Sequence, residues 1–313
     1  MLSSLAVVLE RPKQVALARL PLDRPTDGDV TIKTLWSGVS AGTERLLFTG
    51  RMPAFPGMGY PLVPGYESVG RVVDAGPDAR IEIGTQVFVP GAKCFGDTIR
   101  CVHGGAASLL VAPAARAVPV PAELGENAVL LALAATALHA LGGSALEEVL
   151  IVGHGVLGRL LARLVIASGG EPPIVWEANT VRAGGALGYE VTSSDADARK
   201  TYRTIFDVSG DPAILDPLVQ RLAPGGEIVL AGFYDRLSFS FPPAFMREAR
   251  IRVAAIWRDG DLAKIVKLVE GGTLSLDGLI THRSPAVDAS SAYPVAFDDP
   301  SCLKMVLDWS ASS

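Results

Sequence analysis

The chain has 313 residues, of which 49% are hydrophobic and 19% charged, and its formal net charge is −5. This length favours two domains with a core each, and the composition excludes a disordered protein. A mildly acidic chain without a basic patch is not expected to bind nucleic acid, and three cysteines are too few for a disulfide framework.

The N-terminal residues lack the positive start and the long apolar core of a signal peptide. The longest apolar stretch, residues 128–141, is shorter than the roughly 18 residues that a membrane-spanning helix needs, so we expect a buried helix there. These features predict a cytoplasmic protein without a membrane span. Peripheral association with a membrane surface stays open.

Up to about residue 120 the pattern predicts an all-β domain. Short β-branched runs between glycines and prolines indicate strands at residues 5–9, 30–36, 69–73, 86–89 and 108–111. Residues 37–44 and 51–65 are so rich in Gly, Pro and Ser that we expect irregular loops, where functional residues often lie. In and beside the second loop, apolar side chains either line a substrate site or form a small core: Phe48, Met52, Phe55, Met58 and Tyr60.

After residue 121, alternating strand and helix patterns predict an α/β fold with a doubly wound parallel sheet. We expect strands at residues 149–152, 174–177, 205–208, 227–231 and 250–256. We expect helices at residues 125–141, 155–168, 181–187, 213–222 and 261–270. The tail that follows has β-like runs, which are candidates for a return to the first domain.

The strand pattern at residues 149–152 runs directly into a glycine-rich segment, which we call the glycine turn. Its residues are Gly153, His154, Gly155, Val156, Leu157 and Gly158. In a dinucleotide-binding turn, the first glycine permits the tight bend, the second lets the backbone approach a pyrophosphate, and the third lets helix and strand pack closely. We therefore expect a nicotinamide dinucleotide at this turn.

Glu177 ends the next expected strand, 24 residues after Gly153, near the expected place of a ribose-binding carboxylate. A carboxylate there accepts hydrogen bonds from ribose hydroxyls and repels a 2′-phosphate, which favours NAD over NADP. Arg182 leaves the choice open, because a guanidinium group either stacks on adenine or meets a 2′-phosphate. Ser209 and Gly232 follow later strands, as further cofactor contacts or as ordinary turn residues.

Three motifs resemble the medium-chain dehydrogenase/reductase superfamily: Ser37-Gly38-Val39, the sequence Pro-Gly-Tyr-Glu-Ser-Val-Gly at residues 64–70, and the glycine turn. The resemblance covers nearly the whole chain. It implies a β-rich, GroES-like catalytic domain at residues 1–122 with a C-terminal return at 272–313, and a Rossmann NAD-binding domain at 123–271. It also implies an active site in the cleft between the domains, and a homodimer.

Many zinc-dependent members of the superfamily bind a catalytic zinc through a cysteine, a histidine and a third residue. At these positions this chain has Ser40 or Ala41, then Tyr66, then a residue near Ala132. A hydroxyl, a phenol and a methyl group do not hold zinc, which prefers thiolate, imidazole or carboxylate. The departure from the family pattern predicts a zinc-independent enzyme with no metal ligands.

Without a metal, a protein group must take the hydroxyl proton of an alcohol that is oxidised. Tyr66 is the first candidate, provided that its pKa falls below the usual value of about 10. The alternative for Tyr66 is a packed aromatic side chain that replaces a lost ligand. Thr43 and Ser40 are candidates to pass the proton on, and Glu67 either orients the loop or serves as the terminal acceptor.

Within the superfamily, residues 48–67 resemble the hydroxyethyl bacteriochlorophyllide dehydrogenases of bacteriochlorophyll biosynthesis. This resemblance implies a tetrapyrrole substrate, a bacteriochlorophyllide or chlorophyllide, whose C3 1-hydroxyethyl group is oxidised to acetyl with NAD. Two alternatives stay open. One is a quinone- or enone-reducing relative that uses NADPH, against which Glu177 argues. The other is a catalytically silent pigment-binding protein, against which the intact glycine turn argues.

Overall fold

The computed structural model describes residues 2–97 and 99–311. The chain forms two compact units: unit 1 comprises Met1–Ala132 and Asp277–Ser313, and unit 2 comprises Leu133–Leu276. The first limit lies later than the expected one, because the helical segment η2 (Ala122–Leu130) packs against strands of unit 1.

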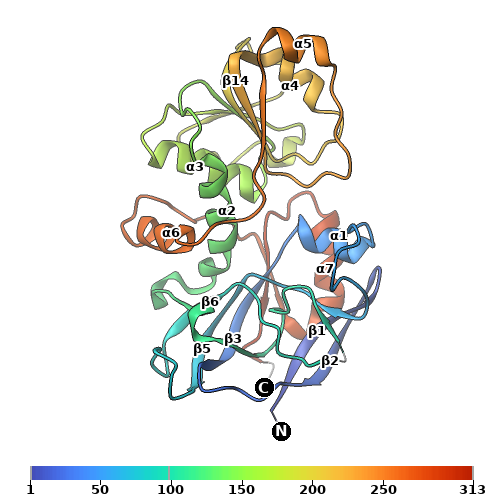
Figure 1. Cartoon of the computed structure of the whole chain (residues 1–313), viewed down its shortest axis with the longest axis vertical. Coiled ribbons are helices and arrows are strands. Elements are labelled where there is room, and N and C mark those ends of the chain that lie inside the picture. The colour runs from blue at the N-terminus through green and yellow to red at the C-terminus, as the bar shows by residue number, and fades with distance from the viewer. Residues whose placement is uncertain (1, 98, 312–313) are drawn as a thin grey trace. The chain divides into compact units, whose positions relative to one another are not determined.

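Among its described residues, unit 1 contains two β-sheets (Figure 1). The four-stranded sheet has the order β2-β1-β4-β7, with β1 at Ser3–Arg11, β2 at Gln14–Pro21, β4 at Leu62–Val63 and β7 at Arg100–Cys101. The seven-stranded sheet has the order β16-β17-β3-β5-β6-β9, and β8 pairs with β3. Its strands are β3 Asp29–Val39, β5 Ser68–Ala75, β6 Gln86–Val89, β8 Leu109–Pro113, β9 Val118–Pro119, β16 His282–Pro285 and β17 Met305–Asp308.

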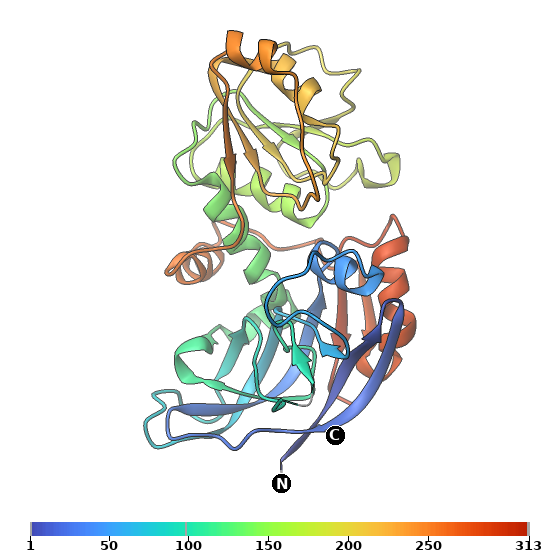
Figure 2. The same ribbon diagram turned by 45° about the vertical axis from the view of Figure 1, so that its right-hand side comes forward.

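Segments from both ends of the chain meet in unit 1. Strand β17 from the C-terminal tail pairs antiparallel with β3. Helix α7 (Ala289–Asp298) packs on β2, which comes from the N-terminal end (Figure 2). Helix α1 (Thr43–Thr49) shares a buried core with α7 through Leu47, Phe48, Tyr293 and Phe297. The tail is therefore an integral part of unit 1. The other short helical segments described in unit 1 are η1 Ala114–Arg116 and η4 Ala286–Asp288.

The expectation of irregular loops in unit 1 was partly wrong. Ser37 lies within β3, where it pairs with Ser68 of β5 on one side and with Leu307 of β17 on the other. Helix α1 follows at once, and the short strand β4 lies inside the second expected loop. Strand β2 was not expected either. In each strand, pairing with neighbours overrides the local composition.

Unit 2 contains a parallel sheet with the strand order β12-β11-β10-β13-β14-β15. The chain proceeds outward from β10 to β12, returns to β13 beside β10, and continues outward to β15. This is the order of a doubly wound Rossmann sheet, as predicted. The strands are β10 Val149–Val152, β11 Ile174–Trp176, β12 Glu190–Thr192, β13 Tyr202–Asp207, β14 Leu222–Leu230 and β15 Arg250–Val253. The helices are α2 Leu131–Leu141, α3 Val156–Ala167, η3 Thr180–Arg182, α4 Leu215–Arg221, α5 Phe241–Met246 and α6 Asp261–Glu270.

Two expected helices differ from the structure. The helix expected at residues 125–141 is shortened, because Gly125 has the non-helical angles φ 50° and ψ −133°. The helix expected at residues 181–187 is wrong. Only the short η3 forms there, since Gly185 has a left-handed φ of 81° and the carbonyls of Gly184 and Gly185 accept hydrogen bonds from Arg159.

Residues Ala122–Leu141 are long and apolar enough, by length and composition alone, to cross a membrane. However, 56% of their most apolar window is buried inside the protein. Gly125 also interrupts the helical backbone within the stretch. We interpret the stretch as a core segment, in agreement with the buried helix expected from the sequence.

Candidate active site and dinucleotide site

The glycine turn links the fully buried strand β10 to helix α3. Gly153 has a φ of 106°, which side chains rarely adopt, and a Cβ on Gly158 would lie 1.9 Å from the carbonyl oxygen of Gly153. Both positions therefore require glycine. Gly155 is the N-cap of α3, and a Cβ there would meet nothing within 4 Å. No side chain caps this helix, so its first N–H groups have no side-chain acceptor, and a helix start of this kind suits an anion such as a pyrophosphate.

Glu177 lies directly beside the glycine turn. Its Oε2 accepts a hydrogen bond from the backbone N–H of His154 at 2.9 Å, and its Oε1 accepts one from that of Asn179 at 2.8 Å. The carboxylate is half-buried. Each carboxylate oxygen has a second lone pair, so the fixed group keeps acceptor capacity for a ligand hydroxyl.

The His154 ring is completely buried and serves the protein's own loop. Its Nδ1 lies 2.7 Å from the carbonyl oxygen of Arg182, and its Nε2 lies 2.8 Å from the Tyr189 hydroxyl. Burial lowers the pKa of His154, which keeps the ring neutral near pH 7. Arg159 of α3 donates to the carbonyls of Arg182 and Gly184 at 3.0 and 2.7 Å. The loop that carries Arg182 is thus tied to the glycine turn by Arg159 and Tyr189, which the sequence did not single out.

The next parallel strand, β13, ends beside β10, because Val152 pairs with Asp207. Asp207 is buried, and it accepts hydrogen bonds from the Tyr234 hydroxyl at 2.6 Å and from the Ser209 N–H at 2.9 Å. A Cβ on Gly232 would lie 2.5 Å from the Tyr234 hydroxyl, so only glycine fits there. Ser209 and Gly232 thus lie at the carboxyl edge of the sheet, together with Gly153.

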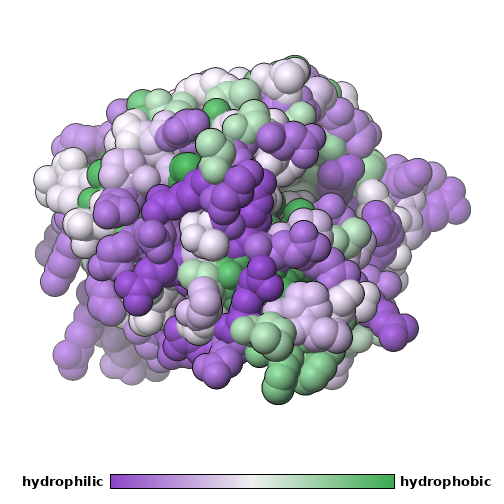
Figure 3. All heavy atoms as spheres, turned by 90° about the horizontal axis from the view of Figure 1, so that it is seen from above, coloured by the Kyte–Doolittle hydropathy of each residue, from purple (hydrophilic) through white to green (hydrophobic). Residues whose placement is uncertain are grey.

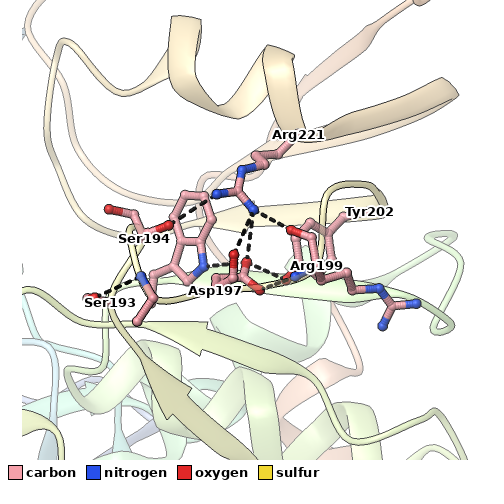
Figure 4. A network of polar contacts seen from close by, with 8 residues as sticks. Ser193, Ser194, Asp197, Arg199, Tyr202 and Arg221 are labelled. Carbon is pink, nitrogen blue, oxygen red and sulfur yellow. Dashed lines mark hydrogen bonds and ion pairs between the residues drawn. The ribbon is translucent and has the colours of Figure 1, made fainter.

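A second buried carboxylate, Asp197, anchors the end of β11 (Figure 4). Its Oδ2 accepts hydrogen bonds from Trp176 Nε1 at 2.9 Å and from the Tyr202 hydroxyl at 2.6 Å, and Arg221 Nη1 lies 3.4 Å from it. Trp176 directly precedes Glu177 in the chain. The network therefore fixes the strand end that presents the candidate ribose-binding carboxylate.

In unit 1, three of the predicted catalytic residues lie together. Ser40 directly follows β3, and its hydroxyl lies 2.6 Å from the Tyr66 hydroxyl. Thr43, the first residue of α1, provides a second hydrogen bond to Tyr66. The phenol is therefore held by two hydroxyl groups, one just after β3 and one at the start of α1.

The condition set for Tyr66 as the proton acceptor, a pKa below the ordinary value of a phenol, is not met. Burial, and then the negative charge of Glu67, raise the pKa of Tyr66 above its ordinary value, and the bonds from Ser40 and Thr43 offset only part of this effect. Tyr66 is accordingly a neutral phenol near pH 7, which can give one proton and accept another but does not rest as a phenolate.

Glu67 is completely buried and is paired with a lysine that the sequence did not suggest. Lys304 Nζ lies 2.6 Å from Glu67 Oε2 and also donates to the carbonyl of Val39 at 3.3 Å. A Cβ on Gly38 would lie 2.2 Å from the same carboxylate oxygen, so the pair requires glycine in β3. Of the two roles expected for Glu67, this geometry suits orientation of the loop.

Glu44 is the acidic group that sequence reasoning missed. It is buried in the first turn of α1. Its Oε1 accepts a hydrogen bond from the Ser40 N–H at 3.1 Å, and its Oε2 accepts one from the Tyr293 hydroxyl at 2.7 Å. Burial raises the pKa of Glu44 to about 7, against the lowering effect of the Tyr293 bond. Burial therefore favours the protonated form of Glu44 more than that of an exposed glutamic acid.

The described residues contain no group of three His, Cys, Asp or Glu side chains that could hold a metal ion. Ser40 and Tyr66 bond to each other, and Ala132 is buried in α2. The donor set at these positions does not suit zinc.

Most of the apolar side chains in and beside the second expected loop belong to a core that they share with β1, α7 and β17. Phe48 is buried and packs on the Phe297 ring at 5.3 Å, and Met52, Met58 and Tyr60 pack against the same cluster. Phe55 is the exception, with 43% of its surface exposed. Most of these side chains therefore serve packing within unit 1, through a core that is larger than the loop itself.

Residues 26–122 match the family described as the alcohol dehydrogenase GroES-like domain. The chain is 54% identical over 316 residues to the 2-desacetyl-2-hydroxyethyl bacteriochlorophyllide A dehydrogenase of Cereibacter sphaeroides, covering 98% of this chain and 99% of the relative. It is also 54% identical over 306 residues to the dehydrogenase of the same name from Rhodobacter capsulatus, with 97% of each chain covered.

Among solved structures, an alcohol dehydrogenase from Escherichia coli CFT073, complexed with cofactor NADH, matches with a TM-score of 0.83 at 21% identity. The match covers 98% of this chain and 99% of that one, and it shows the shared fold. The chain belongs to the family of the 2-desacetyl-2-hydroxyethyl bacteriochlorophyllide A dehydrogenases, oxidoreductases of the medium-chain dehydrogenase/reductase superfamily.

Proposed function

We propose that this chain oxidises the C3 1-hydroxyethyl group of a bacteriochlorophyllide or chlorophyllide to acetyl, in the biosynthesis of bacteriochlorophyll a. We infer the substrate from the 54% identity, over nearly the whole chain, to two dehydrogenases whose names contain a hydroxyethyl bacteriochlorophyllide. The chemistry is supported by the hydroxyl cluster around Tyr66 and by the glycine turn.

We propose NAD as the cofactor, bound on the glycine turn. The uncapped start of α3 and the open space at Gly155 suit a pyrophosphate. The fixed carboxylate of Glu177 supports NAD, since it accepts ribose hydroxyls and repels a 2′-phosphate. In this proposal Arg182 contacts the adenosine part of NAD, and Ser209 and Gly232 lie at the ends of the neighbouring strands, where they contact the cofactor. When bound, NAD supplies the acceptor for the hydride.

At the alcohol, Tyr66 orients the substrate oxygen and accepts its proton as it passes its own proton to Ser40. Thr43 holds the phenol from a second direction. The buried pair of Glu67 and Lys304 fixes the backbone next to Tyr66, because Lys304 also donates to the carbonyl of Val39 at the end of β3. The reaction is zinc-independent in this proposal, since the hydroxyl groups take the place of metal ligands.

The test is to incubate the purified protein with 3-hydroxyethyl bacteriochlorophyllide a and with NAD or NADP, following the pigment absorption and the reduced nucleotide together. We expect stoichiometric formation of acetyl pigment and NADH, with NAD preferred. No turnover with either nucleotide would contradict the enzyme proposal and favour a pigment-binding protein, and reduction of quinones by NADPH would favour the other alternative. One tightly bound zinc per chain in an active preparation would contradict zinc independence.

We also propose a homodimer that forms through the edge of the unit 2 sheet. Strand β15 pairs only with β14 among the described strands, and its Val253 side chain is 73% exposed. Next to it, α5 and the segment before it expose Phe239, Phe241, Phe245 and Met246, and Ile251 of β15 is also partly exposed. Figure 3, which views the end of unit 2 that carries α4 and α5, shows hydrophobic residues gathered at one edge of a mostly hydrophilic face. An open strand edge beside an apolar patch suits pairing with a second copy.

A further inference from the structure

A single peptide group, the one between Val39 and Ser40, is held on both sides by buried charged side chains. Its C=O, which belongs to Val39, accepts a hydrogen bond from Lys304 Nζ at 3.3 Å. Its N–H, which belongs to Ser40, donates to Glu44 Oε1 at 3.1 Å. The backbone N–H of Glu44 also donates to the Ser40 carbonyl at 3.1 Å. The backbone on both sides of Ser40 is therefore fixed, and Glu44 makes two of these three contacts.

The second carboxylate oxygen of Glu44 is held by the C-terminal tail. Glu44 Oε2 accepts a hydrogen bond from the Tyr293 hydroxyl at 2.7 Å, although the two residues lie 249 positions apart in the chain. Tyr293 is itself completely buried in α7, where its ring packs edge-on against Phe297 with the ring centroids 5.7 Å apart. Helix α7 thus fixes the direction of the carboxylate that holds Ser40.

A buried carboxylate is a costly group at the start of α1. Glu44 is only 1% exposed, and the donors to its two oxygens, a backbone N–H and a phenol, are neutral. Removing a carboxyl group from water costs stability, and an apolar side chain at this position would avoid that cost. In return, the carboxylate gives the Ser40 backbone a fixed position, which an apolar side chain does not provide.

We infer that Glu44 is a positioning residue for Tyr66, and that Tyr293 supports it. Ser40 Oγ lies 2.6 Å from the Tyr66 hydroxyl, so a fixed Ser40 backbone fixes the direction of this hydrogen bond. In this role Glu44 takes no proton and acts through the Ser40 backbone. The inference deepens the proposed alcohol oxidation and rests on it, because there Tyr66 orients the substrate oxygen.

The first test compares two substitutions of Glu44 with the hydroxyethyl pigment and NAD. Glu44→Gln keeps an oxygen for the Ser40 N–H, and its NH2 group can donate to the Tyr293 hydroxyl, so kcat should stay within about threefold of the wild type. Glu44→Ala loses both bonds, and kcat should fall about 100-fold while KM for the pigment changes by less than about threefold. A Gln variant as slow as the Ala variant would overturn the positioning role, because the reaction would then need the charge of Glu44.

A milder variant keeps the inference testable if Glu44→Ala does not fold. Tyr293→Phe removes one hydroxyl and keeps the ring that packs on Phe297. We expect kcat to fall about tenfold, because the carboxylate then has one fixed oxygen instead of two.

The matched control for Tyr293→Phe is Ser37→Ala. It removes another buried hydrogen bond between β3 and the tail, the one that Trp309 Nε1 donates to Ser37 Oγ at 2.8 Å. This control should leave kcat unchanged, because it does not touch the peptide group before Ser40. An unchanged kcat in Tyr293→Phe, or an equal loss in Ser37→Ala, would overturn the inference.

A double-mutant cycle separates positioning from a general structural defect. In the Tyr66→Phe background the hydroxyl that Ser40 holds is missing, so adding Tyr293→Phe should lower kcat by less than about twofold. A structural defect would lower kcat by the same factor in both backgrounds, and that result would overturn the inference.

A further readout does not depend on turnover. The chain has 6 tyrosines, so fluorine NMR of protein labelled with fluorotyrosine gives few signals, and the signal missing in Tyr66→Phe identifies Tyr66. This signal should shift in Tyr293→Phe and stay in place in Ser37→Ala. A signal that stays in place in both variants would overturn the inference. A protein that is inactive on the pigment but shows the shift would contradict the proposed oxidation and still support the positioning of Tyr66.

Discussion

Tyr66 takes the position at which the family resemblance leads us to expect a histidine metal ligand, and its surroundings determine what it can do instead. Its hydroxyl is fixed by Ser40 at 2.6 Å and by Thr43, and its pKa is raised by burial and by the nearby Glu67. A neutral phenol orients the substrate hydroxyl and passes a proton on better than it removes a proton by itself.

Replacing Tyr66 by Phe tests this role at the residue scale. The change removes only the hydroxyl, so we expect kcat/KM for the pigment to fall about 100-fold while the dissociation constant for NAD stays the same. Stopped-flow turnover and NAD titration by fluorescence measure the two quantities. An unaffected rate would show that Tyr66 only packs, the alternative that the sequence left open.

The site residues show how far sequence reasoning reaches at this scale. Ser40, Thr43 and Tyr66 were predicted from motif positions, and the structure brings them together. Lys304 lies 237 positions from Glu67 in the chain, and a lone lysine in a C-terminal tail carries no signal that it will be buried. The pairing follows from the return of the tail beside β3, which only the three-dimensional fold provides.

At the scale of elements, the glycine turn shows two different uses of glycine. Gly158 is required by packing, because any Cβ would collide with the carbonyl of Gly153 at 1.9 Å. Gly155 has an ordinary φ of −73° and open space around it, so packing within the protein does not explain it. We propose that Gly155 leaves room for the pyrophosphate of the cofactor.

We therefore expect opposite effects from two alanine substitutions. Gly158→Ala should destabilise the protein by about 1–3 kcal/mol or more, because helix and strand must move apart. Gly155→Ala should leave the melting temperature unchanged but weaken NAD binding by about tenfold or more, since the methyl group occupies the space for the pyrophosphate. Thermal melting and calorimetric titration with NAD separate the two, and a Gly155→Ala variant with wild-type affinity would contradict this site.

The elements themselves were predicted with uneven success, for physical reasons. The strands β10 and β11 and helix α6 have strong apolar patterns, and the structure places them where the sequence predicted. The helix expected at residues 181–187 fails because the carbonyls of this loop bond to a buried arginine from α3 instead of to their own chain. Such long-range competition is invisible to a local pattern.

At the scale of the whole molecule, each unit has its own buried core, and most exposed apolar surface is scattered. The group around α5 and β15 is an exception in unit 2, since Phe241, Phe245, Met246 and Val253 are each more than 60% exposed. Apolar side chains beside a free strand edge are a liability for a monomer, because such an edge pairs readily with other chains. A defined partner at this edge removes the liability.

If two copies pair through β15, a charge on this strand should separate them. We expect the wild type to have twice the mass of one chain by light scattering. Val253→Lys changes the exposed last residue of β15, and it should have the mass of a single chain at micromolar concentration, because the contact would have to bury the lysine charge of each copy. Val287→Lys is the matched control: Val287 is 50% exposed in unit 1, and the variant should stay dimeric. A Val253→Lys dimer with unchanged affinity would place the contact elsewhere. A monomeric wild type would exclude the dimer.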